Sequence, residues 1–167
     1  APAPAPTARR AAAELGGVPG PELRAPHIDT RAGLREILAL TSDASSGLPH
    51  VVGYRGELCA TADDARALLA DVPGLAGIAG DLNVDGSIGS RTAAMRLPYQ
   101  DGPDRGDRGN LYLTAEQIAD HLSAVAAAGT QGGFHVIGAR AMDELVLGLG
   151  LAAAAHGQGA GRAARPG

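Results

Sequence analysis

Polar side chains alternate with apolar ones in one stretch of this sequence that otherwise resembles a buried strand. Successive side chains of a strand point to opposite faces, so Leu82 and Val84 share one face while Asp81, Asn83 and Asp85 share the other. A buried carboxylate is costly unless it is paired or binds a cation. The alternation therefore predicts either polar groups that point into a cleft or barrel lumen, or an edge strand with a solvated polar face.

A histidine interrupts a second apolar stretch in the same way. In a predicted strand over residues 133–137, Phe134 and Val136 share one face and His135 lies on the other, near the carboxyl end. The carboxyl ends of parallel strands are where α/β proteins place their sites. A neutral imidazole there can bind a metal or act as a general base. The alternative is a core histidine whose ring nitrogens bond to the backbone. Asp85 also ends its strand, so it is expected on the same open face as His135.

A loop rich in glycine and serine follows Asp85, over residues 86–92. Its backbone N–H groups, together with Ser87, Ser90 and Arg91, could hold an anion or a substrate carboxylate. The glycine spacing matches neither a P-loop nor a dinucleotide-binding loop. A plain connection is therefore the alternative for this segment.

Hydrophobic periodicity and capping residues predict alternating helices and strands in the middle of the chain. Helices are predicted over about 30–40, 61–72, 114–128 and 139–155, and strands over about 51–54, 79–84 and 133–137. This order predicts an α/β fold with parallel strands and crossover helices. His121 lies in the middle of the third helix and is expected to be solvated.

The two ends differ from the middle in composition. Residues 1–28 are rich in Ala and Pro and predict an irregular arm, and residues 157–167 are Gly, Ala, Arg and Pro and predict a disordered tail. Residues 29–156 are expected to form the folded domain.

Composition excludes several classes of function. The net charge is -4 and the only aromatic residues are three Tyr and one Phe, which argues against a nucleic-acid partner. The chain has no Lys, which excludes a Schiff-base or P-loop lysine. A single cysteine, Cys59, excludes an internal disulfide and fits a reducing, cytoplasmic compartment. No apolar run reaches the length of about 18 residues that a membrane span needs.

Two stretches resemble the YtcJ-like branch of the metal-dependent amidohydrolase superfamily. Residues 81–94, followed by Pro98, Tyr99 and Asp101, are similar to the family's DGS-GSRTAA…PY-D stretch. Residues 129–138 are similar to its G-Q…HAIGD stretch.

The resemblance extends over residues 51–150 and implies a (β/α)8 TIM-type barrel, of which this chain would hold about three to four βα units. It implies hydrolysis of a non-peptide, amide-like C–N bond in a small molecule, with a divalent metal such as zinc. His135 matches a metal ligand, and Asp81 falls where many members have a metal-bridging lysine. The substrate contacts would come from four residues: Asp85, Ser87, Ser90 and Arg91.

The sequence departs from this family at several places. The His-x-His motif, a later metal histidine and the catalytic aspartate are absent, and Ala139 stands where the family has the Asp of HAIGD. We therefore expect an incomplete and inactive fragment with exposed strand edges. The alternative is a non-catalytic α/β module that binds a small anionic ligand through residues 86–92. The sequence gives no indication of oligomeric state.

Overall fold

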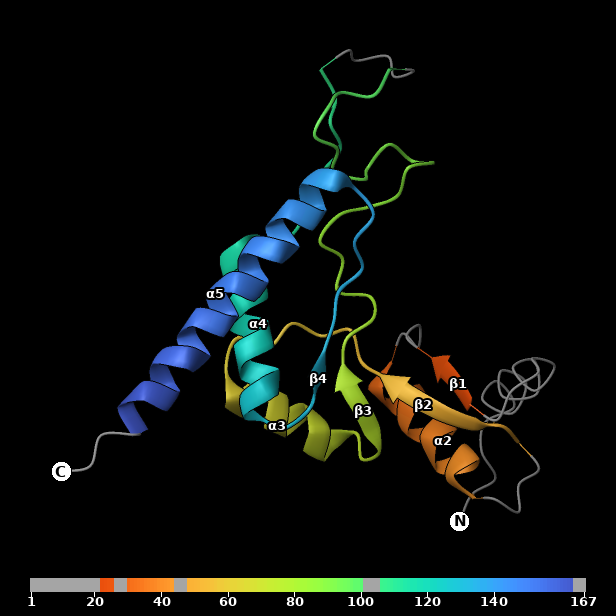
Figure 1. Ribbon diagram of the computed structural model, residues 1–167. Coiled ribbons are helices and arrows are strands. Elements are labelled where there is room, and N and C mark those ends of the chain that lie inside the picture. The colour runs from red at the N-terminus through yellow and green to blue at the C-terminus, as the bar shows by residue number, and fades with distance from the viewer. Residues whose placement is uncertain (1–21, 26–29, 44–47, 101–105, 164–167) are drawn as a thin grey trace.

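Four βα units follow one another along the part of the chain that the structure describes (Figure 1). The computed structural model describes residues 22–25, 30–43, 48–100 and 106–163. The strands are β1 (Glu22–Ala25), β2 (His50–Tyr54), β3 (Leu75–Ile78) and β4 (Gln131–Gly132). The helices are α2 (Arg31–Ser42), α3 (Ala62–Asp71), α4 (Ala115–Ala127) and α5 (Ala139–Ala163).

The strands form one parallel sheet in the order β1-β2-β3-β4. The predicted α/β class with parallel strands is therefore confirmed, whereas these four strands do not show a closed barrel. No helix within the described ranges combines the length and apolar character that crossing a bilayer requires.

Three helices begin at the capping residues that the sequence predicts. The Thr30 side chain accepts from the Gly33 N–H at the start of α2. Thr61 and Asp64 form a reciprocal capping box at α3, and α4 begins with a second box. Each box satisfies two backbone donors that the first helical turn would leave free. These starts are local features, which explains why sequence reasoning finds them.

The strand predicted over 79–84 is wrong, because β3 ends at Ile78. Gly80 then adopts a φ of 99°, a left-handed conformation that breaks the extended strand. The strand predicted over 133–137 is also displaced, since β4 comprises residues 131–132. The two predicted stretches nevertheless meet at one bridge, where Asn83 pairs with His135 in parallel.

Both predicted irregular ends contain secondary structure. Within residues 1–28, β1 pairs with β2 from Glu22 opposite His50 to Ala25 opposite Gly53, so the expectation of an irregular arm is wrong there. At the other end α5 continues through residues 157–163, where a disordered tail was predicted. This extension contains three glycines, whose helix propensity is low, so local composition does not predict it. The remaining predicted arm and tail residues, 1–21, 26–28 and 164–167, lie outside the described residues.

The apolar core has two parts. The first lies where α2, α3 and α4 cover the sheet and includes Leu34, Val51, Leu68, Ile78 and Val125. The second joins the segment after β3 to α4 and α5 through these buried residues: Val84, Ala94, Ile118 and Ala141. Figure 1 shows α4 and α5 side by side, so the second core packs the far end of the chain against the third βα unit.

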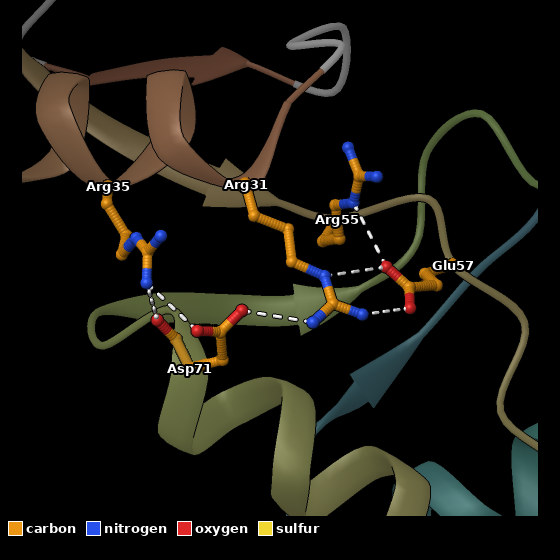
Figure 2. Close-up of polar contacts among 5 residues, drawn as sticks. All are labelled: Arg31, Arg35, Arg55, Glu57 and Asp71. Atoms are coloured by element: carbon orange, nitrogen blue, oxygen red, sulfur yellow. Dashed lines mark hydrogen bonds and ion pairs between the residues drawn. The ribbon is translucent and has the colours of Figure 1, made fainter.

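An ion-pair network joins α2 to α3 and to the segment after β2 (Figure 2). Arg31 donates to both carboxylate oxygens of Glu57 and, over 3.0 Å, to Asp71. Arg35 donates to Asp71 over 2.9 Å, and Arg55 donates to Glu57. The hydrogen bonds from Arg31 are the main reason that the pKa of the Glu57 carboxyl lies below its usual value. Because these groups are substantially exposed, we assign the network an orienting role more than a large share of stability.

The chain between β3 and α4, described over residues 79–100 and 106–114, forms a long excursion beyond the carboxyl ends of β3 and β4 (Figure 1). Its two arms are joined by backbone hydrogen bonds from Met95 to Arg108 and from Tyr99 to Asp107. The Arg96 guanidinium is bidentate on the Asp143 carboxylate, which ties the excursion to α5.

The contact between α4 and α5 predicts opposite effects for two glycines of α5. A Cβ on Gly148 would lie 2.6 Å from the Ile118 Cγ2 and 2.8 Å from the Ala115 carbonyl oxygen. We expect Gly148→Ala to lower the free energy of unfolding by about 1–3 kcal/mol, because overpacking outweighs alanine's helix propensity.

Gly150 is the matched control, since nothing lies within 4 Å of a Cβ built there. Gly150→Ala should raise the free energy of unfolding by up to about 1 kcal/mol. Chemical denaturation of both variants and the wild type measures the difference. Equal stability of the two variants would contradict the close packing at Gly148.

Candidate functional site

The candidate site lies where the chain leaves the carboxyl ends of β3 and β4. The His135 N–H donates to the Leu82 carbonyl over 2.9 Å, and the Val84 N–H donates to the His135 carbonyl over 3.0 Å. Asn83 is therefore the bridge partner of His135. Side chains of paired residues project to the same face of a ladder, so the Asn83 amide and the His135 imidazole share one face.

The predicted alternation is confirmed for four of the five polar and apolar positions. Leu82 and Val84 are buried, while Asp81 and Asn83 are exposed. Asp85 departs from the pattern, because it is fully buried instead of sharing the face of Asp81 and Asn83. The fifth position is thus where local periodicity fails.

The Asp85 carboxylate accepts three backbone hydrogen bonds. Its Oδ2 accepts from the N–H groups of Ala94 and Gly138, each over 2.7 Å, and its Oδ1 accepts from the Ile137 N–H over 2.9 Å. The partner that a buried carboxylate requires is therefore a set of backbone dipoles, and a cation is not needed to explain the burial. The predicted contact between Asp85 and a substrate stays a prediction.

Hydroxyl groups organise the loop over residues 86–92. The hydroxyls of Ser87 and Ser90 lie 2.9 Å apart, and those of Ser90 and Thr92 lie 2.6 Å apart. The Ser87 N–H donates to the Thr92 hydroxyl over 3.0 Å. Ser87 and Ser90 are both exposed, so the predicted contacts face solvent at the surface of the loop.

Arg91 has a left-handed backbone conformation, with a φ of 57°. A residue with a Cβ adopts this conformation at an energetic cost, and such strain is concentrated at functional sites. Arg91 is the single non-glycine residue with positive φ within the described ranges. The loop therefore holds its arginine in a conformation that glycine would adopt more easily.

His135 is half-buried beside the same loop. Its Nε2 lies 3.4 Å from the Gly86 carbonyl oxygen, a long contact that places the ring against the beginning of the loop. Asp81 lies on the neighbouring segment, close to Gly56 after β2, where an added Cβ would be 2.9 Å from the Asp81 nitrogen. The structure thus brings together His135, Asn83 and the loop, and it places Asp81 on the exposed side of the segment.

The donors present do not form a metal centre by themselves. Imidazole and carboxylate are ligand types that zinc accepts, and structural or catalytic sites use three or four protein ligands. Within the described ranges no three His, Cys, Asp or Glu side chains gather closely enough to hold an ion. Glu57, the other carboxylate at this end of β2, is engaged by Arg31 and Arg55.

His121 is buried, so the expectation that it is solvated is wrong. Its Nδ1 accepts from the Cys59 N–H and its Nε2 faces the Ile78 carbonyl oxygen, both over 3.1 Å. Because Nδ1 accepts a hydrogen bond here, the ring is neutral and its proton is on Nε2, facing the Ile78 carbonyl. Burial lowers the pKa of His121 below its usual value. The ring therefore joins the end of β3 and the segment after β2 to α4.

Sequence reasoning missed the pairing of Asn83 with His135 and the structural role of His121. The sequence contained a sign that Asn83 belongs to the site, since it lies between the two aspartates of the polar alternation. The sequence around His121 gave little sign of its role, because its two partners, Cys59 and Ile78, are 62 and 43 residues away.

Comparison with solved structures gives two similar folds. An uncharacterized metal-dependent hydrolase from Pyrococcus horikoshii OT3 matches 71% of this chain and 24% of its own, with 26% identity and a TM-score of 0.51. An uncharacterized metal-dependent hydrolase from Pyrococcus furiosus matches 72% of this chain and 25% of its own, with 23% identity and a TM-score of 0.55. The matched region therefore spans about a quarter of each of these proteins. No protein-family model and no curated protein matches the chain.

The burial of His121 predicts a pH dependence of stability. Its pKa is lowered in the folded state, so the unfolded chain takes up the proton first and stability falls as the pH drops below about 6.5. His121→Gln keeps a donor for the Ile78 carbonyl and cannot be protonated, so we expect a smaller loss of melting temperature between neutral and mildly acidic pH.

His156, which is exposed on α5, provides the matched control. His156→Gln should leave the pH dependence of the melting temperature unchanged. Thermal melts followed by circular dichroism measure all three proteins. A pH dependence in His121→Gln equal to that of the wild type would contradict the neutral, buried ring.

Proposed function

We propose that this chain forms part of a metal-dependent hydrolase of the amidohydrolase type, in the YtcJ-like branch, acting on amide-like C–N bonds of small molecules. The observation that carries the proposal is the position of His135, held in register with Asn83 beyond the carboxyl ends of parallel strands. That is where βα folds of this kind place their sites. The similarity to two metal-dependent hydrolases supports the same class.

His135 is the proposed nitrogen ligand of the metal, and Asp81 on the neighbouring segment is the proposed oxygen ligand. The half-buried imidazole has a long contact to the Gly86 carbonyl, 3.4 Å from Nε2, and that weak bond can be exchanged for a metal. Zinc is the proposed metal, since it accepts nitrogen and oxygen ligands together. A zinc site uses three or four protein ligands, so these two residues are proposed as part of a site, and the activity of the whole protein is part of the proposal.

Ser87, Ser90 and Arg91 are the proposed substrate contacts. The two hydroxyls are exposed, and the strained backbone at Arg91 holds a guanidinium in the same loop. A guanidinium and hydroxyl groups are suited to bind the oxygen atoms of a polar, amide-like molecule. Asp85 lies beneath them and supports the loop.

Zinc binding to the intact chain tests the proposal. In calorimetric titration with zinc alone, we expect His135→Ala to weaken the affinity at least about tenfold, the range that loss of even an outer-shell partner produces. His156→Ala removes an exposed histidine of α5 and should leave the affinity unchanged. Affinity that is unaffected by His135→Ala, or equally weakened by both variants, would contradict the assignment.

The strain at Arg91 gives a second test. We expect Arg91→Gly to be more stable than Arg91→Ala by about 0.5–1 kcal/mol, because only glycine relieves the left-handed conformation. Both variants remove the same side chain, so the difference measures the backbone alone. Chemical denaturation provides the measurement, and equal stabilities would show that the loop does not hold Arg91 in this conformation.

A further inference from the structure

A single buried carboxylate joins the two segments that carry the proposed site residues. Asp85 is fully buried, and its donors lie nine, 52 and 53 residues further along the chain. One donor, Ala94, closes the loop that Asp85 opens. The other two, Ile137 and Gly138, lie two and three residues after His135. The carboxylate thus fixes both ends of the loop and the segment that carries His135.

The backbone around this carboxylate is shaped to fit it. The Ala94 carbonyl accepts from the N–H groups of Arg140 and Ala141 in the first turn of α5. A Cβ on Gly138 would lie 2.0 Å from the Ala94 carbonyl oxygen, so only glycine allows this approach. The carboxylate also lies at the amino end of α5, where the helix dipole stabilises negative charge.

We propose that Asp85 is a positioning residue that couples the loop over 86–92 to the His135 segment. The two segments then undergo local opening as one cooperative unit. The inference rests on the proposed function for the roles of His135 and Arg91, and it adds the group that holds them relative to each other. Gly86, the first residue of the loop, is the residue whose carbonyl faces the His135 Nε2. A loop held in this way carries Arg91 and the imidazole at a fixed separation.

Asparagine cannot replace this aspartate. All three partners of Asp85 are N–H donors shared between its two oxygens. An amide offers one accepting oxygen and one NH2 group, which is itself a donor. Either orientation of the amide therefore faces at least one backbone N–H with another donor.

Native-state hydrogen exchange of the intact wild-type chain tests whether the segments move together. We expect the bonded amides of Gly86, Thr92 and Ala94 to share one opening free energy with those of Ile137 and Gly138, as amides of one cooperative unit do. Different opening free energies for the two segments would overturn the proposal. This measurement needs no variant.

Asp85→Asn provides the second arm. We expect exchange to become about tenfold faster or more in both segments, and the imidazole carbon resonances of His135 to shift or split. Asp64→Asn is the matched control, because Asp64 also accepts a backbone N–H, from Thr61, but lies at the start of α3. It should leave both segments and the His135 resonances unchanged.

Three results would overturn the proposal: faster exchange in only one segment of Asp85→Asn, unchanged His135 resonances, or the same changes in Asp64→Asn. If Asp85→Asn does not fold, the wild-type exchange decides the question by itself. None of these measurements uses zinc, so a failure of the zinc titration would remove the proposed function without affecting the result for Asp85.

Discussion

The buried carboxylate of Asp85 is the interaction on which the arrangement of the site depends. It replaces the water that a carboxylate would otherwise bind with three backbone N–H groups from two distant segments. The hydrogen bonds from Ala94 and Gly138 are buried, and without the carboxylate their N–H groups would lack this partner, which is costly for a buried donor. A single side chain of the excursion therefore satisfies backbone donors both in the excursion itself and just before α5.

His121, a residue of α4, is likewise buried with backbone groups as its hydrogen-bond partners. Its neutral ring accepts from the Cys59 N–H and faces the Ile78 carbonyl. It also makes a T-shaped contact with the Phe134 ring, with centroids 5.2 Å apart. In both cases a polar side chain that resembles a catalytic group is buried among backbone partners. The ion pairs of Figure 2, in contrast, lie at the surface and remain partly solvated.

Local features of the fold were predictable from the sequence, and contacts between distant residues were not. Thr30, Thr61 and Thr114 mark helix starts because a cap needs only the next few residues. The strand after Gly74 was displaced because Leu75–Ile78 contains two small residues that give little hydrophobic signal. Residues 81–84 alternate polar and apolar side chains as a strand does, but Gly80 breaks the extended backbone just before them. β1 was missed because its pairing with β2 depends on residues further along the chain.

The candidate site shows the same division. Alternation correctly separated Asp81 and Asn83 from Leu82 and Val84, and it placed His135 opposite Phe134 and Val136, which pack against the second core. The same rule gave the wrong surroundings for Asp85, since the three N–H groups that bury it belong to residues that no local pattern connects to it.

The distance between Asp85 and its partners also bears on how the chain folds. Two of the three donors lie more than 50 residues away, and closing so large a loop carries an entropic cost before any contact is gained. During synthesis Asp85 leaves the ribosome well before Ile137 and Gly138 exist, so its carboxylate stays hydrated while the earlier βα units assemble. The excursion is therefore expected to reach its native arrangement late, after α4 has formed and the chain has returned past β4.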